Sequence, residues 1–359
     1  MAATHLRGHT PETLVAAFPG LALPVARRVV HRLVGQDRDE LDGVPGLSKA
    51  CARALREGGR LERLEVVDRR RSEVDPFVKY LFRASDGRVF ESVRIPLEQP
   101  RFSVCVSSQV GCALGCRFCE TGRLGFLRNL EAWEMVEQVL RVRGESQERP
   151  TTGVVFQGQG EPLQNYDNVM QAASVLRHPC GARIGADRIT ISTVGLLPQL
   201  ERYIEERQPY RLILSLSSAF SEKRERLVPI TARYGVPELA AAARRLAAAR
   251  GGPVQLAWVL ISGYNTGPEE ALELARLFRG VRVRLSVIDV NDPSGGFERA
   301  SDAERSRFLS ASAERKQPRS ASLARTKPPS GSFTSITESR TRAPRKSRAS
   351  SSASSAPVL

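Results

Sequence analysis

Between residues 98 and 309 the chain alternates short runs of strand-forming residues with longer segments whose apolar residues recur at helical spacing. Strands are expected at 102–107, 154–157, 188–192, 212–217, 254–261 and 283–288. Helices are expected between them at 131–142, 166–176, 196–206, 237–250 and 268–278. Strands joined by crossover helices form a parallel sheet, and a strongly twisted parallel sheet closes fully or partly into a barrel. We therefore predict an α/β fold, a partial (β/α)6 barrel at 98–309 that binds its ligands at the carboxyl ends of the strands.

Composition marks off a zone on each side of this predicted barrel. Residues 1–97 hold 17 basic and 13 acidic side chains and combine short helical stretches with two strands around an Asp86-Gly87 turn, so we expect a small accessory α+β domain. Residues 310–359 contain fourteen Ser, ten Lys or Arg and two Glu. Because this segment has no apolar periodicity and too little apolar surface to offset its ordering entropy, we predict a disordered basic tail.

Charge and hydropathy exclude some classes of protein. The 359 residues carry 54 Lys plus Arg and 39 Asp plus Glu, a net charge of +15 that favours a polyanionic partner such as nucleic acid. The predicted tail holds +8 of that charge, so the rest of the chain is only mildly basic. No apolar run reaches the roughly 18–20 residues of a membrane span, and the N-terminus lacks the pattern of a secretory signal. We therefore expect a cytoplasmic protein with no membrane partner.

The strongest chemical signal is a C-x3-C-x2-C cluster of Cys112, Cys116 and Cys119, directly after the first strand of the predicted barrel. Glycines at four nearby positions permit a tight loop: Gly111, Gly115, Gly122 and Gly125. Three thiolates on one loop can hold three irons of a cubane iron–sulfur cluster and leave the fourth iron open to another ligand. The alternatives are a zinc site short of one ligand and a set of buried structural thiols, although the sequence offers no matching Cys/His half for zinc. Disulfides are not expected in a cytosolic chain with six cysteines.

These residues carry a family resemblance. The string CVSSQVGCALGCRFCETGRLGFLRNL, with Phe118 before the last cysteine, resembles the radical S-adenosylmethionine (SAM) superfamily, and in particular its RNA adenosine methyltransferases of the RlmN/Cfr type. The later segments GQGEPLQN, ISTVG, LSLSSA, AWVLISGYN and IDVNDP resemble motifs of that family in the same order, from about Phe90 to about Phe308. The resemblance implies a [4Fe-4S] cluster held by the three cysteines, with SAM bound at the open iron.

The resemblance also assigns residues to the cofactor. Glu161, in a glycine-rich turn after the second predicted strand, matches the residue that binds the SAM ammonium group, and Gly160 allows close backbone approach. The other matching positions lie at or near strand ends and are Ser192, Ser215, Leu216, Ser217 and Asn291. Judged without the resemblance, a Gly-Glu-Pro turn with a solvated glutamate is the favoured interpretation, and the serines are ordinary turn residues.

Two further positions match residues that act on the RNA in this family. Cys105 matches the cysteine that attacks the target adenine, and Glu91 matches the proposed proton acceptor. A buried thiol in a strand and an exposed strand glutamate are the alternatives for these two residues. Cys51 and Cys180 match nothing in the family and are expected to be structural.

The chain departs from the family pattern after Ser310. The family carries a methyl-accepting cysteine near its C-terminus, whereas this sequence has no cysteine after Cys180. A reading-frame shift near Ser310 and a genuine basic tail that binds RNA phosphates both account for the change. As written, the chain is expected to bind the cluster and SAM without methylating RNA by the family mechanism. Gln159 replaces a methionine of the family pattern and Ser217 replaces a histidine, which affects the expected cofactor contacts.

The resemblance implies a set of partners. We expect large-subunit ribosomal RNA as substrate, with carbon 2 of adenosine favoured over carbon 8, transfer RNA as a second candidate, and a cellular electron donor. Residues 1–97 are then an RNA-binding accessory domain, and the protein is expected to be a monomer. The alternatives are a catalytically defective RNA-binding paralogue and a radical SAM enzyme with a non-RNA substrate.

Overall fold

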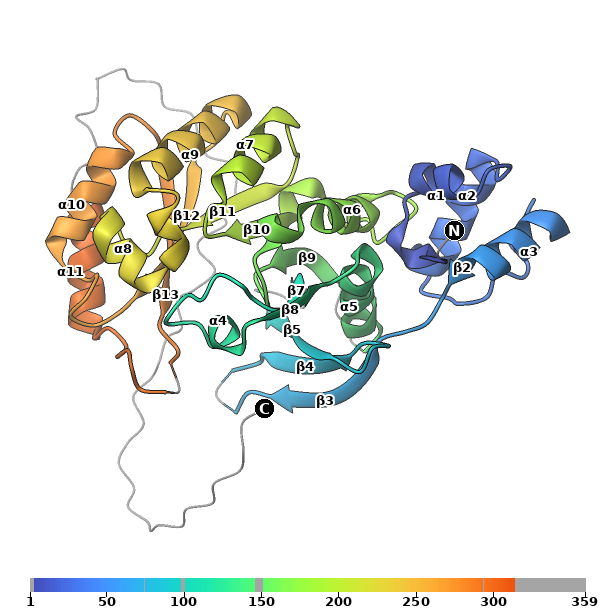
Figure 1. Cartoon of the computed structure of the whole chain (residues 1–359), viewed down its shortest axis with the longest axis horizontal. Helices are drawn as coiled ribbons and strands as arrows, with labels where there is room; N and C mark the ends of the chain where they lie inside the picture. The colour runs from blue at the N-terminus through green and yellow to red at the C-terminus, as the bar shows by residue number, and fades with distance from the viewer. Residues whose placement is uncertain (1–2, 74, 98–100, 146–150, 293, 314–359) are drawn as a thin grey trace, which may run out of the picture.

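A parallel sheet forms the centre of the molecule. The computed structural model describes residues 3–73, 75–97, 101–145, 151–292 and 294–313. Its parallel strands are β6 (Phe102–Val106), β9 (Thr151–Phe156), β10 (Ile189–Thr193), β11 (Arg211–Ser215), β12 (Val254–Leu260) and β13 (Val283–Asp289). Each strand is hydrogen-bonded to the next in this order (Figure 1). All of them correspond to predicted strands, so the predicted α/β fold is confirmed.

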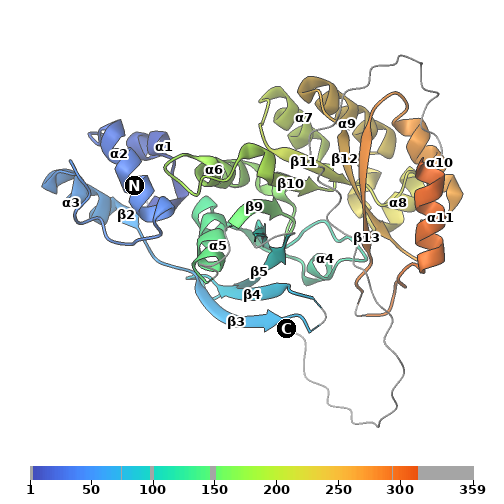
Figure 2. The same ribbon diagram turned by 180° about the vertical axis from the view of Figure 1, so that it is seen from behind.

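Crossover helices cover one side of this sheet. They are α5 (Ala132–Gly144), α6 (Tyr166–Arg177), α7 (Leu197–Glu205), α9 (Val236–Arg250) and α10 (Pro268–Leu277), each within two residues of its predicted bounds. Figures 1 and 2 show them along the outer side of the curved sheet. Val104 and Val106 of β6 point to that side and are fully buried. Since side chains alternate along a strand, the residues between them point to the opposite, helix-free face.

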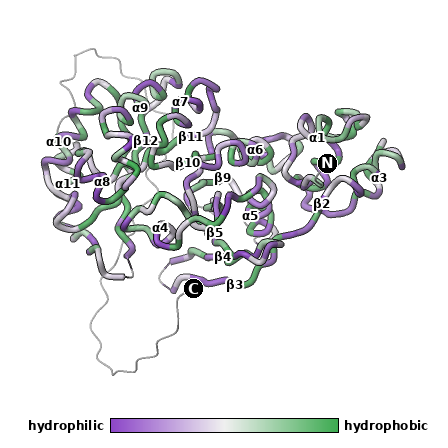
Figure 3. Tube along the Cα trace, in the orientation of Figure 1, coloured by the Kyte–Doolittle hydropathy of each residue, from purple (hydrophilic) through white to green (hydrophobic). Residues whose placement is uncertain are grey.

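Three antiparallel strands lengthen the sheet beyond β6. They are β3 (Glu65–Arg71), β4 (Val78–Arg83) and β5 (Val89–Pro96), and they continue the sheet in the order β6-β5-β4-β3. The turn between β4 and β5 lies at Asp86 and Gly87, as predicted, and Asp86 Oδ1 accepts a 3.0 Å hydrogen bond from the Arg88 N–H. The sheet therefore crosses the domain boundary expected at residue 97. β3 is an edge strand, and its run of charged residues, drawn hydrophilic in Figure 3, is typical of a protected edge.

The N-terminal residues form a helical unit at one end of the molecule. It contains α1 (Pro11–Ala17), α2 (Leu23–Val30) and α3 (Lys49–Gly58), with the short parallel pair β1 (Thr4–His5) and β2 (Gly59–Arg60). The ring of His5 stacks on Trp133 of α5 with centroids 3.9 Å apart. Buried Arg7 pairs with Glu137 of α5 at 3.6 Å. Stacking and ion pairing thus dock this unit onto the first crossover helix.

Short elements fill the helix-free side of the sheet. β7 (Gln109–Gly111) and β8 (Phe126–Asn129) form an antiparallel ribbon around α4 (Glu120–Leu124), and α8 (Ser221–Leu227) follows β11. Figures 1 and 2 both show α4 between the β13 and β4 ends of the sheet. Sequence periodicity did not predict these elements because each is shorter than two helical turns or a typical strand.

The described chain ends in a helix. α11 (Asp302–Ala313) contacts α10, and its Phe308 ring lies 5.1 Å from that of Trp258 on β12. The helix continues past the boundary expected at 309, and the rest of the predicted tail lies outside the described residues. Among the residues that the structure describes, no helix is long and apolar enough to cross a membrane.

Candidate functional site

The three cysteines of the C-x3-C-x2-C cluster occupy the loop between β7 and α4. Gly111 has a φ of +74°, and a β-carbon there would overlap the carbonyl oxygen of Gly125, so the start of the loop requires glycine. Cys116 is buried, whereas Cys112 and Cys119 are half-buried. The loop thus holds all three thiols as free cysteines on one short segment.

The thiols of this loop share one electrostatic environment. Burial raises the pKa of Cys112 to about 11 and that of Cys116 to about 12. Negative charge on Cys119 and on Glu161 raises both pKa values further. Within the described ranges, no three Cys, His, Asp or Glu side chains are grouped as ligands of a single metal ion. Thiolates that each bind a different iron of one cluster do not need to converge on one ion.

Glu161 lies beside the cysteine loop, at the end of β9. Its carboxylate is buried and accepts 3.0 Å hydrogen bonds from the backbone N–H groups of Leu163 and Val194. Burial raises its pKa. Each carboxylate oxygen can accept a second hydrogen bond, so these contacts leave acceptor capacity for a ligand. Gly160 has a φ of +100°, and a β-carbon there would lie 2.9 Å from the backbone nitrogen of Gln109 on β7.

The remaining residues predicted to bind the cofactor differ in their solvent exposure and in their hydrogen bonds. Ser192 on β10 is 7% exposed, and Ser215 at the end of β11 is half-buried. Ser217 has a φ of +58° and accepts a 3.3 Å hydrogen bond from the Val259 N–H. Leu216 is fully buried, its N–H donates to Ala257 and its carbonyl accepts from Arg224, an arrangement that does not favour the predicted contact. Asn291 is exposed beyond β13.

Strand register places Glu91 and Cys105 on the same face of the sheet. Cys105 on β6 lies directly opposite Val93 on β5, and Glu91 is two residues from Val93, so the side chains of Glu91 and Cys105 point the same way. Their face is the helix-free one. Glu91 Oε2 lies 3.2 Å from Lys79 Nζ on β4, and burial raises the pKa of Cys105 to about 12.

The same face continues across the parallel strands. Cys105 is in register with Val155, and Val155 with Thr190, so Ser192 shares their face two residues further along β10. Ser192 is in register with Ile213, which places Ser215 on that face as well. The structure therefore brings Glu91, Cys105, Ser192 and Ser215 onto one face, with the cysteine loop at its carboxyl edge.

Comparison with known proteins decides the family. Residues 106–278 match the model of the radical SAM superfamily. Over 309 residues the chain is 43% identical to a probable RNA methyltransferase of Myxococcus xanthus, covering 85% of this chain and 86% of that protein. It is 36% identical over 310 residues to the dual-specificity RNA methyltransferase RlmN of Syntrophotalea carbinolica, covering 84% and 81%. The crystal structure of a radical SAM methyltransferase from Sphaerobacter thermophilus aligns with a TM-score of 0.79 at 36% identity, covering 88% of this chain and 94% of that one.

This chain belongs to the radical SAM RNA methyltransferases of the RlmN/Cfr type. Radical SAM methyltransferases use a [4Fe-4S] cluster and SAM. The residues present fit that pair of cofactors, because three free cysteines on one loop supply the thiolates and a buried carboxylate with spare acceptor capacity stands next to them.

Two buried polar residues of this radical SAM methyltransferase were not singled out from its sequence. Asn265 donates 2.7 Å hydrogen bonds to the carbonyls of Ser217 and Val259, and so fixes the turn after β11. It ends the segment AWVLISGYN, so the family motif contained a signal for it. Arg224 on α8 is fully buried as well. It lies in the run SEKRERL, whose charge density is typical of a solvated helix, so no sequence signal pointed to its burial.

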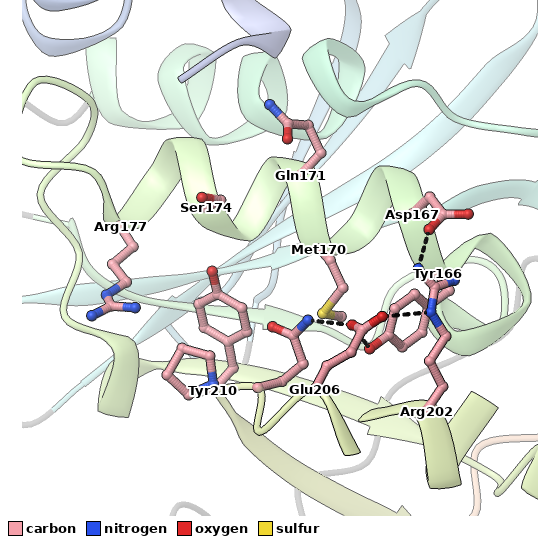
Figure 4. Close-up of a pocket in the computed structure, with 11 residues that line it drawn as sticks. Tyr166, Asp167, Met170, Gln171, Ser174, Arg177, Arg202, Glu206 and Tyr210 are labelled. Atoms are coloured by element: carbon pink, nitrogen blue, oxygen red, sulfur yellow. Dashed lines mark hydrogen bonds and ion pairs between the residues drawn. The ribbon is translucent and has the colours of Figure 1, made fainter. Parts of the chain in front are cut away.

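A pocket of about 370 Å³ lies on the helix side of this methyltransferase, lined by residues of α6, α7 and the loop before β11 (Figure 4). The Tyr166 hydroxyl donates a 2.6 Å hydrogen bond to Glu206, and the Arg202 guanidinium lies 4.2 Å from the Tyr166 ring. Arg202 also pairs with Glu206 and Asp167 at 2.7 Å each. These polar groups satisfy one another, and none of the predicted site residues lines the pocket.

Proposed function

We propose that the site of this chain is built to bind large-subunit ribosomal RNA at carbon 2 of an adenosine, with transfer RNA as a second substrate, although the chain lacks the cysteine that would carry the methyl group. We further propose that it works as a cytoplasmic monomer that receives electrons from a cellular donor. The observation that carries the proposal is the shared face of Cys105 and Glu91 at the edge of the cysteine loop. The Ser107 hydroxyl, between Cys105 and that loop, donates a 2.5 Å hydrogen bond to the Glu91 carbonyl, which ties Glu91 to this edge.

Cys105 and Glu91 are the side chains proposed to act on the RNA base directly. A thiol attacks an adenine carbon only as a thiolate, and burial raises the pKa of Cys105 to about 12, so the resting thiol holds its proton. Glu91, paired with Lys79 on the same face, is the group proposed to accept a proton from the reacting base. When bound, the cluster and SAM supply the radical chemistry that makes an unreactive adenine carbon reactive.

The missing cysteine limits what the chain as written can complete. The family mechanism requires a second thiol to carry the methyl group, and no cysteine follows Cys180 in the sequence. We therefore propose that the chain binds both cofactors and cleaves SAM reductively without transferring a methyl group to RNA. Sequencing of the gene around codon 310 tests the alternative that the reading frame shifts there.

The test uses the full chain, reconstituted anaerobically with iron and sulfide and supplied with dithionite, SAM and either ribosomal or transfer RNA. Mass spectrometry then measures 5′-deoxyadenosine and methylated adenosine. We expect 5′-deoxyadenosine from the parent chain, none from Cys112→Ala, and no methylated adenosine from either. Methylation at carbon 2 would confirm carbon 2 of adenosine as the target and would overturn the proposal that the chain transfers no methyl group. A parent chain that produces no 5′-deoxyadenosine would refute the proposed SAM cleavage.

A second function is favoured by the same missing cysteine. A chain that binds RNA without modifying it needs the RNA contacts and not the cofactors. Ultraviolet crosslinking to ribosomal RNA, compared between the reconstituted and the cluster-free protein, separates the two functions. Equal crosslinking combined with no SAM cleavage supports the binding protein, and crosslinking that depends on the cluster supports the enzyme.

A further inference from the structure

α8 connects the cysteine loop to the ends of two strands. The Leu227 carbonyl at the C-terminus of α8 accepts a 2.9 Å hydrogen bond from the Arg117 N–H, and Arg117 lies between Cys116 and Cys119. One turn earlier on the same helix is Arg224, whose side chain is 0% exposed. The backbone contact therefore fixes the distance between the cysteine loop and a buried guanidinium.

The guanidinium of Arg224 binds the strand ends through neutral acceptors. Nε donates to the Leu216 carbonyl at 2.9 Å, and Nη2 donates to the carbonyls of Val194 at 2.6 Å and Ser215 at 3.1 Å. Nη1 donates to the Thr231 hydroxyl at 2.7 Å. Val194 is also the residue whose N–H binds Glu161. Arg224 thus joins the segment after β10, the end of β11 and the turn after α8 in one hydrogen-bonded unit.

The positive charge of Arg224 has no carboxylate partner within 4.0 Å among the described residues, in contrast to buried Arg7, which pairs with Asp39 and Glu137. A buried charge without a counter-ion is costly. Burial lowers the pKa of Arg224 to about 10, and the opposing influences are the negative charges of Cys116 and Glu161. The nearby negative charges therefore belong to the cluster loop and to the predicted SAM-binding carboxylate.

We propose that Arg224 is a positioning residue whose buried positive charge balances the thiolate-bound cluster and whose hydrogen bonds hold the SAM-binding strand ends against the cysteine loop. A [4Fe-4S] core bound by three thiolates carries net negative charge and gains more on reduction. A fixed cation in a medium of low dielectric constant stabilises the reduced state more than the oxidised state, and so raises the reduction potential. This inference rests on the cluster that family membership implies and is independent of the RNA substrate.

The experiment compares R224K, which keeps the charge, with R224Q, which removes it and keeps donor groups for the carbonyls. Each full-length protein is reconstituted anaerobically, and its cluster is titrated electrochemically under electron paramagnetic resonance, without SAM or RNA. At one fixed potential we expect the ratio of reduced to oxidised cluster to fall about tenfold in R224Q and to stay within about twofold of the parent in R224K. Iron per chain and circular dichroism are measured on the same samples.

Arg7 provides the matched control, because it is equally buried and lies in the N-terminal unit. R7K and R7Q are expected to change stability and to leave the reduced-to-oxidised ratio unchanged. An unchanged ratio in R224Q, or an equal fall in R224Q and R224K, would overturn the proposed charge effect. Should R224Q fail to fold, R224K still tests the proposal, since a tenfold fall with the charge retained contradicts it. Because the readout needs no RNA, failure of the proposed RNA specificity leaves this outcome unaffected.

Discussion

Glu161, after β9, accepts a 3.0 Å hydrogen bond through Oε2 from the backbone N–H of Val194, after β10. The contact joins the ends of two neighbouring parallel strands with the charged group that is predicted to bind SAM. The same carboxylate therefore holds two strand ends together and is the predicted SAM ligand, so we expect a substitution there to affect both stability and SAM binding.

We predict that Glu161→Gln lowers the affinity for SAM about tenfold or more, because the amide loses the charge that attracts an ammonium group. The free energy of unfolding falls by about 1–3 kcal/mol, because an amide cannot accept both backbone hydrogen bonds. Equilibrium dialysis with the reconstituted protein measures the first effect and urea unfolding the second. Glu206→Gln, in the helix-side pocket, serves as control and leaves SAM affinity unchanged. Equal SAM affinity in the Glu161→Gln variant and the parent would rule out the predicted role.

Alanine substitutions at Gly160 and Gly87 separate the cost of backbone strain from the cost of steric overlap. Both have positive φ, +100° and +80°, but only at Gly160 would a β-carbon meet neighbouring atoms within 4 Å. Gly87→Ala is expected to cost about 1 kcal/mol for its backbone conformation, and Gly160→Ala a further 1–3 kcal/mol, roughly, for overlap with Gln109. Urea unfolding of the two variants measures the difference. Equal losses would show that the contact with Gln109 relaxes without cost.

Alkylation of Cys105 in the cluster-free protein is predicted to depend steeply on pH. With a pKa of about 12, only about one thiol in ten thousand is ionised at pH 8, and the rate rises about tenfold per pH unit from there through pH 10. In the urea-denatured chain the same thiol has its ordinary pKa, so its rate levels off above pH 9. Iodoacetamide labelling followed by peptide mass spectrometry measures both profiles. If the alkylation rate of the native protein levelled off at the same pH as that of the denatured chain, burial would not raise the pKa of Cys105.

Acid is predicted to weaken the N-terminal unit through His5. Burial lowers the pKa of His5 from 6.5 to about 3, so the folded state keeps the ring neutral while the unfolded chain binds a proton below pH 6.5. The contribution of His5 to stability is complete above pH 6.5 and falls by about 1.4 kcal/mol per pH unit as the pH drops towards 3. Urea unfolding followed by tryptophan fluorescence, to which Trp133 and Trp258 both contribute, measures the loss at pH 7.5 and 5.5. His5→Asn is expected to flatten this pH dependence, and an undiminished slope would exclude His5 as its source.

The sequence predicted the parallel half of the fold well and the antiparallel half less completely. Strands β6 and β9 to β13 are apolar runs flanked by long amphipathic helices, a local pattern that requires no knowledge of partners. The β4–β5 hairpin was also predicted from its turn. Its pairing with β6 was not, because strand pairing between distant segments depends on long-range contacts.

The candidate site shows the same limit at the level of single residues. The spacing of Cys112, Cys116 and Cys119 suggested a cluster from the sequence alone. The shared face of Glu91 and Cys105 follows from the register between β5 and β6, which the hydrophobic pattern does not determine. Arg224 was missed because its neighbours are charged, and only the packing of α8 against two strand ends reveals its burial.

The antiparallel extension of the sheet has a consequence for access. β3 and β13 are the two edges of the sheet, and within the described residues they do not pair with each other, so the strands do not close into a ring. A closed barrel admits its substrate only through the mouth, which suits a small molecule. An open sheet with Cys105 on an inner strand instead allows entry from the side, so that a long polymer can lie across the rim and present one unstacked unit without threading a free end.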